Sequence, residues 1–349
     1  MKRSLVAIAC FLAVAIIFAS CSKAPTETPP QFPETTKGVY IVNEGNFGRG
    51  NASLTYYDLG RDTVYYDVFA AVNGRSLGDV ANSMAIRDSL GFIVVNNSDK
   101  IEVIRTKDSH SVATIHLAPG SSLRQIVFVG NKGYVTNLYT SSVAVIDLAN
   151  YAVVKTIPVG ENPEGIVFTN GKLFVANSGF GAGTTISVID PQQGTVIDTI
   201  SVAFNPTAEI VGADGNLYVL CTGSYGDFNN PYDDVYASML VINPQSGARV
   251  DSLFIGGHPT KMALGKDGVL YVAADTSVVS IDTHSHHFLG TFVGRGYYGV
   301  GADAVTGDVY LLDAKDYASP GEVFVFSPAG TLKKNFSAGV IPGSVAFVR

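Results

Sequence analysis

Asparagine recurs at one kind of position in the chain, where an aromatic-aliphatic segment gives way to a polar one. The segments "VYIVN", "FIVVN", "YVTN" and "FVAN" end at Asn43, Asn96, Asn137 and Asn177. A carboxamide side chain both donates and accepts hydrogen bonds, so such residues suit a neutral ligand rich in amide or hydroxyl groups. The same side chains also hydrogen-bond to their own loop backbone, and the sequence leaves both interpretations open.

Aromatic and charged residues accompany these asparagines in the polar segments. Aromatic rings offer flat apolar area with few rotatable bonds, and charged groups fix polar substituents. The candidate ligand-binding residues are Asn43, Glu44, Asn46, Asn96, Asn97, Arg124, Asn137, Tyr139, Glu164, Asn177, Phe180, Tyr225, Phe228, Tyr232, Tyr297 and Tyr298. Each group has a structural alternative. The aromatic residues of 222–238 pack their own loop, at least one of Tyr297 and Tyr298 is core, and Arg124, Glu164, Glu209 and Lys261 neutralise one another around water.

No motif in the chain predicts catalysis or a metal site. Neither GxSxG nor HExxH occurs, and "GFGAGT" has no following helix to cradle a phosphate. "HSHH" at 284–287 falls in a predicted hairpin turn, and "DFNNPYDD" lacks EF-hand spacing. We therefore expect no catalytic residues, no metal site, no cofactor and no enzymatic activity.

The elements that position these residues come from an internal repeat. An aromatic residue followed by aliphatic residues recurs seven times, at intervals of 39 to 53 residues, at Tyr40, Phe92, Tyr134, Phe174, Tyr218, Tyr271 and Tyr310. Residues 163–202 resolve into four short strands, "GIVFT", "KLFVAN", "TTISVID" and "GTVIDTISV". Four-stranded repeats of this length are typical of β-propeller blades, and no stretch shows convincing helical periodicity.

The two ends of the repeat predict how the ring closes. The chain ends in "GSVAFVR", which matches a first strand, and the domain starts with "GVYIVN", which matches a second strand. The sequence thus predicts an all-β, seven-bladed propeller over 38–349, closed by pairing of the C-terminal strand with the N-terminal blade. First strands line a propeller's channel, where Arg124, Glu164, Glu209 and Lys261 are expected.

The N-terminal region predicts export and lipid attachment. Lys2 and Arg3 precede an apolar stretch, and "FASC" resembles a bacterial lipobox, so residues 1–20 are a predicted signal peptide and Cys21 a predicted lipid anchor. Residues 21–37 are rich in Pro and Thr and predict an extended tether. Without Lys2 and Arg3, 21 basic residues face 30 acidic ones, a net charge of about −9 that argues against nucleic-acid binding.

Two resemblances extend this interpretation. "GYVTN", "VAVID" and "VVKTIPVGENPEGI" resemble the YVTN-repeat propellers, and "VNEGNFGRGNASLTYYD" resembles the surface propeller lipoproteins of Bacteroidota. Some members of the latter group capture cobalamin for a TonB-dependent outer-membrane transporter. The resemblance implies a monomeric outer-membrane lipoprotein on the cell surface, or alternatively on the periplasmic face, that binds a corrinoid and contacts the membrane through the lipid on Cys21.

Two other functions remain open at this stage. A propeller also serves as a scaffold for protein contact or glycan adhesion, with the long loop at 222–238 meeting the partner. Propeller lactonases hold calcium in the channel, and Glu44, Glu164 and Glu209 would have to converge there. The fold hosts all three functions, so side-chain geometry has to distinguish them.

Overall fold

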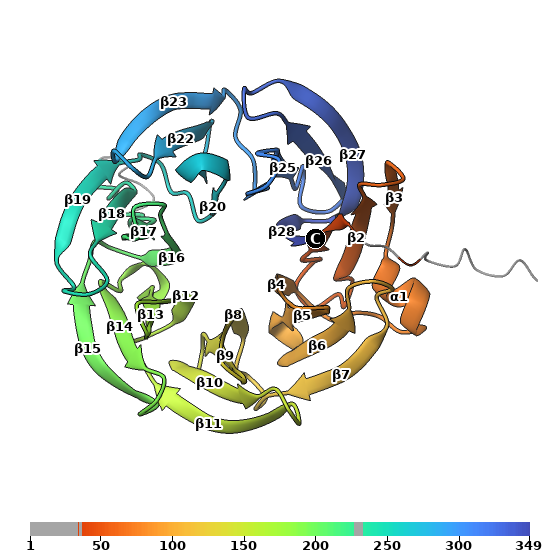
Figure 1. Cartoon of the computed structure of the whole chain (residues 1–349), viewed down its shortest axis with the longest axis horizontal. Coiled ribbons are helices and arrows are strands. Elements are labelled where there is room, and N and C mark those ends of the chain that lie inside the picture. The colour runs from red at the N-terminus through yellow and green to blue at the C-terminus, as the bar shows by residue number, and fades with distance from the viewer. Residues whose placement is uncertain (1–33, 35–36, 227–232) are drawn as a thin grey trace, which may run out of the picture. The chain divides into compact units, whose positions relative to one another are not determined.

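A computed structural model describes residue 34 and residues 37–226 and 233–349. In this part of the chain, seven four-stranded sheets stand side by side around a central axis (Figure 1). Each first strand contacts the first strands of both neighbouring sheets, which closes the ring. The predicted seven-bladed β-propeller is confirmed.

The blades are numbered from the N-terminus, and each is given from its innermost to its outermost strand. Blade 1 consists of β28 (Pro342–Val348), β1 (Gly38–Asn43), β2 (Ser53–Asp58) and β3 (Thr63–Tyr65). Blade 2 consists of β4 (Ala81–Arg87), β5 (Leu90–Val95), β6 (Lys100–Arg105) and β7 (Ser111–His116). Blade 3 consists of β8 (Leu123–Val129), β9 (Lys132–Asn137), β10 (Ser142–Asp147) and β11 (Ala152–Pro158). Blade 4 consists of β12 (Pro163–Thr169), β13 (Lys172–Asn177), β14 (Thr185–Asp190) and β15 (Thr195–Ser201).

The remaining blades follow the same order. Blade 5 consists of β16 (Pro206–Val211), β17 (Leu217–Cys221), β18 (Ser238–Ile242) and β19 (Arg249–Phe254). Blade 6 consists of β20 (Met262–Leu264), β21 (Val269–Ala273), β22 (Val278–Asp282) and β23 (His287–Val293). Blade 7 consists of β24 (Gly299–Ala302), β25 (Val309–Asp313), β26 (Pro320–Phe326) and β27 (Leu332–Val340).

Helical structure is confined to short segments. The α-helix α1 (Val68–Asn73) connects β3 to β4, and three single turns of 3₁₀ helix are η1 (Asn96–Ser98), η2 (Gly179–Gly181) and η3 (Lys266–Gly268). Val68 and Phe69 bury α1 against blade 1. The sequence shows no helical periodicity here because six residues are too few to repeat it. No helix among the described residues is long and apolar enough to span a bilayer.

The core lies between neighbouring blades. Phe174 and Val188 of blade 4 form one cluster with Leu217 and Leu240 of blade 5, and the other seams are built in the same way. Second and third strands are therefore buried on both faces, which explains why their sequences are continuously apolar. Fourth strands such as β11 form the exposed outer rim.

The two chain ends complete the same blade. β28 pairs antiparallel with β1, and this pairing sets Val348 opposite Gly38. The predicted closure is confirmed. Because of this pairing, β1 has a hydrogen-bonded neighbour on both sides, β28 and β2, whereas an open array would leave β1 as an exposed edge strand.

In alternate blades, the tyrosine of the repeat forms a hydrogen bond to the next blade. In blades 1, 3 and 5 its buried hydroxyl donates to the carbonyl oxygen just after the third strand of the next blade. These hydrogen bonds are Tyr40 to Thr106 (3.0 Å), Tyr134 to Pro191 (3.2 Å) and Tyr218 to Thr283 (2.8 Å). The aromatic residue of the repeat thus serves both the core and the alignment of neighbouring blades.

Tyr134→Phe is expected to lower the free energy of unfolding by about 1 kcal/mol, because the Pro191 carbonyl loses its donor in a buried seam. Urea denaturation followed by circular dichroism measures the change. Tyr139→Phe is the control, since the Tyr139 ring is exposed, and it should unfold like the wild type. Equal stability of both variants would show that the seam bond contributes nothing.

Candidate functional site

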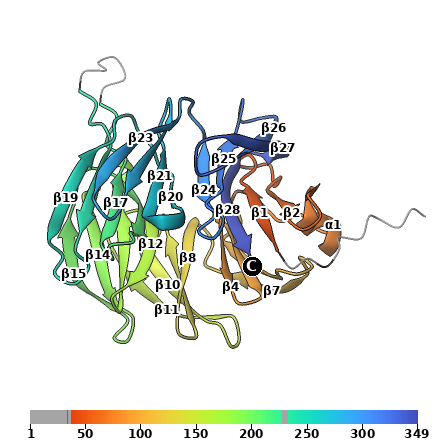
Figure 2. The same ribbon diagram turned by 45° about the horizontal axis from the view of Figure 1, so that its top comes forward.

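One face of the ring carries the longest insertions of the repeat. This upper face comprises the loops joining second to third strands, together with the connections between blades; in Figure 2 the described chain beyond β17 extends to this side. The described loop residues are 44–52, 96–99, 138–141, 178–184, 222–226 with 233–237, 274–277 and 314–319. The turns between third and fourth strands lie on the opposite face and are short.

Exposed aromatic side chains gather on the upper face. Five of its seven second-to-third loops present an aromatic ring that is more than half exposed, namely Phe47, Tyr139, Phe180, Tyr225 and Tyr317. We call these five residues the aromatic platform. The rings of Tyr139 and Phe180, from blades 3 and 4, lie 5.8 Å apart between centroids. Exposed rings from several blades on one face are typical of a surface that binds something large.

Two platform residues hold an unfavourable backbone conformation. Phe180 has φ 50° and Tyr317 has φ 60°, in the left-handed region that disfavours bulky side chains. Their rings gain little burial in return. Strain of this kind is concentrated at functional sites, so it supports a role for the platform in binding. Phe180 was among the residues predicted from the sequence, whereas Phe47 and Tyr317 were not, although both lie in insertions of the repeat.

Beneath the platform, three polar side chains meet at the mouth of the channel. The Tyr298 hydroxyl donates to Glu44 Oε2 at 2.9 Å, and Lys261 Nζ lies 3.8 Å from Glu44 Oε1. A Cβ on Gly343 would lie 2.1 Å from Glu44 Oε1, so this glycine of β28 makes room for the carboxylate. Burial and the Glu44 carboxylate raise the pKa of Tyr298, which therefore stays a neutral donor.

A second charged pair belongs to the same region. Arg124 Nε donates to Glu164 Oε2 at 2.5 Å, joining the second residues of β8 and β12. The charge of Arg124 also acts on Tyr298, in the direction that lowers its pKa. We call Glu44, Arg124, Glu164, Lys261 and Tyr298 the throat. Its two cations and two carboxylates balance in charge. The structural alternative expected Arg124, Glu164, Glu209 and Lys261 to neutralise one another; Arg124 does pair with Glu164, but Lys261 lies beside Glu44 instead of Glu209.

Glu209, on β16, is buried beside β12, the strand that carries the throat residue Glu164. Neither carboxylate oxygen has a hydrogen-bond partner among the described residues. Desolvation raises the pKa of Glu209 well above its usual value, and the charge of Glu164 adds to this. A Cβ on Gly165 would lie 2.0 Å from Glu209 Oε2, so the glycine accommodates the carboxyl group.

Three of the four recurrent asparagines point into their blades. The side-chain amide donates to hydroxyls of the adjacent third strand: Asn43 to Ser53 and Thr55, Asn137 to Ser142, and Asn177 to Thr185 and Ser187. All three are buried. The hydroxyls are therefore their partners, where the sequence had suggested either a ligand or the loop backbone.

The other candidate asparagines are divided between seam and surface. Asn96 is buried and its amide donates to the carbonyl oxygen of Leu123 at 2.8 Å. Asn46 donates to the carbonyl oxygen of Tyr317 at 2.6 Å, which ties the loops of blades 1 and 7 together. Asn97 donates to Asp79 at 2.7 Å. Asn46 and Asn97 thus lie on the upper face, where Asn46 supports a platform residue.

Two of the remaining aromatic candidates, Tyr225 and Tyr297, lie in different surroundings. Tyr225 stacks on His258, with ring centroids 3.8 Å apart. His258 Nδ1 donates to the Thr222 carbonyl oxygen, which fixes the base of the long loop. Tyr297 is partly buried against the core beside Phe324, 5.6 Å away. Phe228 and Tyr232 lie outside the described residues.

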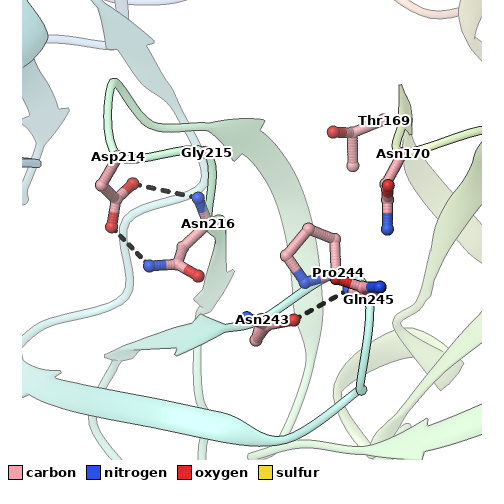
Figure 3. Close-up of a pocket in the computed structure, with 8 residues that line it drawn as sticks. All are labelled: Thr169, Asn170, Asp214, Gly215, Asn216, Asn243, Pro244 and Gln245. Atoms are coloured by element: carbon pink, nitrogen blue, oxygen red, sulfur yellow. Dashed lines mark hydrogen bonds between the residues drawn. The ribbon is translucent and has the colours of Figure 1, made fainter.

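The opposite face has a hollow of about 310 Å³ between the turns of blades 4 and 5 (Figure 3). It is lined by Thr169, Asn170, Asp214, Gly215, Asn216, Asn243, Pro244 and Gln245. Asp214 accepts from the Asn216 side chain at 2.6 Å, and Asn243 accepts from the Gln245 N–H at 2.9 Å. The lining lacks aromatic rings and its turn residues hydrogen-bond to one another, so we place the candidate site on the upper face.

The histidine-rich turn also lies on the opposite face. His286 sits between Asp214 and Asp251, at 2.8 and 3.4 Å, and His284 contacts Asp282 at 3.1 Å. Across the described residues, no three or more His, Cys, Asp or Glu side chains are grouped so as to hold a metal ion. Glu44, Glu164 and Glu209 therefore do not form a three-carboxylate site of the kind the lactonase alternative needs.

A family model matches residues 37–231, which is more than half of the chain. Its description is "Domain of unknown function (DUF5074)". The chain belongs to the DUF5074 family. No curated protein shows significant similarity to it.

Solved structures similar to this DUF5074 protein share its fold. A quinonprotein alcohol dehydrogenase-like protein from Bacteroides thetaiotaomicron aligns at a TM-score of 0.68 with 14% identity, covering 90% of this chain and 79% of that one. A functionally unknown protein from Desulfotomaculum acetoxidans aligns at 0.68 with 14% identity, covering 90% and 99%. A streptogramin B lyase aligns at 0.59 with 11% identity, covering 77% and 90%. Identities this low support the propeller fold and nothing finer.

Proposed function

We propose that this DUF5074 protein is a surface-anchored lipoprotein that captures a large, neutral, amide-rich ligand on its upper face. The ligand we propose is cobalamin or a related corrinoid, passed on to a TonB-dependent outer-membrane transporter. Lipid on Cys21 would hold the propeller at the outer membrane, on the cell surface or alternatively on the periplasmic face. Binding without catalysis or a resident cofactor is part of this proposal.

The aromatic platform carries the proposal. Exposed rings on loops of blades 1, 3, 4, 5 and 7 share the upper face, so together they suit one broad ligand better than a small molecule. The throat beneath them has no excess of either charge, which suits a neutral ligand better than a polyanion. A corrinoid combines a wide apolar macrocycle with peripheral amides, and it therefore matches both features.

Isothermal titration of the purified protein with cyanocobalamin, and separately with dicyanocobinamide, tests the proposal. We expect one-to-one binding, and Tyr139→Ala should weaken it by about tenfold because one stacking contact is worth about 1 kcal/mol or more. Phe288→Ala, on outer strand β23, is the matched control and should bind like the wild type. Absence of heat with both corrinoids, from folded protein, would exclude the corrinoid.

The long loop of blade 5 supports a second function, adhesion to a glycan or a protein. Tyr225 and Tyr236 are both exposed there, and both stack around the buried ring of His258. Such a projecting aromatic pair would also stack on sugar rings. Tyr225→Ala would then abolish capture on a glycan array while corrinoids produce no heat. Retained capture by this variant would count against the loop as the adhesive surface.

A further inference from the structure

Lys261 departs from the repeat at the channel mouth. In blade 6 the repeat aromatic Tyr271 is followed by Val272, which pairs with Met262 of the first strand. Lys261 directly precedes Met262. In the other six blades this position holds Ser344, Ser83, Gln125, Gly165, Ala208 and Gly299, none of which is charged. A long cation at a position that is otherwise uncharged and mostly small indicates a local function.

The Lys261 ammonium has unused hydrogen-bonding capacity. Its nearest charged partner, Glu44 Oε1, is 3.8 Å away, beyond hydrogen-bonding distance, and Nζ donates no hydrogen bond to any described residue. The side chain is only 27% exposed. The three N–H donors of this mostly buried ammonium are therefore available to a ligand, which would displace the water that hydrates them.

The rest of the throat offers matching groups. Arg124 uses Nε for Glu164, and its two Nη groups donate to no described residue. Glu164 Oε1 and Glu44 Oε1 likewise accept no hydrogen bond from the described chain. Both carboxylates are partly accessible. Each of the two throat pairs thus presents N–H donors and oxygen acceptors that the described chain does not use, and their charges balance.

We propose that the throat binds a primary carboxamide arm of the ligand, with Lys261 as the residue that determines specificity. The amide oxygen accepts from Lys261 or Arg124, and the amide N–H₂ donates to Glu44 or Glu164. A carboxylate or phosphate has no N–H to donate and brings negative charge beside two carboxylates; an ester also lacks the N–H. This inference rests on the proposed function and names the chemical group of the ligand that the throat recognises.

A matched pair of corrinoids tests the inference. Dicyanocobinamide carries primary carboxamides, and dicyanocobyrinic acid heptamethyl ester carries methyl esters on the same dicyano macrocycle. We expect the wild type to bind the amide at least tenfold more tightly than the ester in isothermal titration. Lys261→Met should weaken cobinamide binding about tenfold, and Lys261→Arg should restore most of it because a donor returns.

Lys155→Met, on outer strand β11, is the matched control and should leave cobinamide binding unchanged. Thermal melts monitored by circular dichroism confirm that each variant is folded. Equal affinity for amide and ester, or wild-type cobinamide affinity in Lys261→Met, would overturn the throat inference while the proposed function stands. Failure of every corrinoid to bind the wild type would overturn both.

Discussion

Replacing Glu209 with methionine is expected to stabilise the protein by about 1–3 kcal/mol at pH 8, the usual cost of a buried polar group without a partner. Glu209 pairs opposite Val219, the residue after the repeat aromatic Tyr218. The same position in the other six blades holds Val345, Met84, Ile126, Ile166, Met262 and Val300. Methionine already occupies it in blades 2 and 6, so the substitution restores the apolar pattern at similar volume.

The gain should grow as the pH rises. Burial raises the pKa of Glu209 in the folded state, so above the unfolded pKa of about 4.3 the unfolded chain releases a proton that the folded chain keeps. Unfolding of the wild type is then favoured progressively, at up to about 1.4 kcal/mol per pH unit, until the folded pKa is reached. Glu209→Met lacks this loss. Below about pH 4 the gain is smallest, because only the cost of burying an unpaired neutral carboxyl group and the difference in packing remain.

Urea denaturation of both proteins between pH 4 and pH 9 measures the effect. Glu161→Met is the control, because this carboxylate is exposed on a blade connection, and it should change the free energy of unfolding by less than about 0.5 kcal/mol. A Glu209→Met variant less stable than the wild type at pH 8 would mean that Glu209 has a partner in solution, such as an ion or ordered water, that methionine cannot retain.

The propeller was predictable because its signal is repeated seven times. One aromatic-aliphatic segment such as "YVTN" is ambiguous, but seven at blade-length intervals, with matching end strands at Gly38 and Val348, determine blade number and closure. The helix α1 carries no such redundancy and was missed. A repeated pattern thus predicts the scaffold, whereas an element that occurs only once, such as α1, leaves no repeated signal in the sequence.

The sequence indicated which face of the propeller carries the candidate site, but it did not indicate how the side chains on that face are oriented. Insertions of the repeat identify the upper loops, but the direction of each side chain depends on strand register. Asn177 ends its strand pointing at hydroxyls of β14, whereas Phe180, three residues later, points to solvent. The asparagine pattern therefore reflects blade packing. The features on which the proposed ligand site rests are the irregular ones: the strained aromatics, Lys261 and the throat pairs.

Phe180→Gly is expected to stabilise the protein by about 1 kcal/mol while weakening corrinoid binding about tenfold. Phe180 adopts φ 50° between Gly179 and Gly181, and a left-handed conformation costs a non-glycine residue about 1–2 kcal/mol. Glycine removes that strain, although its greater freedom in the unfolded chain offsets part of the gain. It also removes the ring that faces Tyr139, and with it one stacking surface of the platform.

Opposite signs for stability and binding are what distinguish a ligand contact from a packing residue. Asn170→Gly is the matched control, because Asn170 has φ 49° in an exposed turn on the opposite face, and it should change stability alone. Urea denaturation and titration with cyanocobalamin supply the two readouts. If Phe180→Gly both destabilised the protein and bound the corrinoid normally, the ring would be packing its own loop, and the strain at Phe180 would need a structural explanation instead.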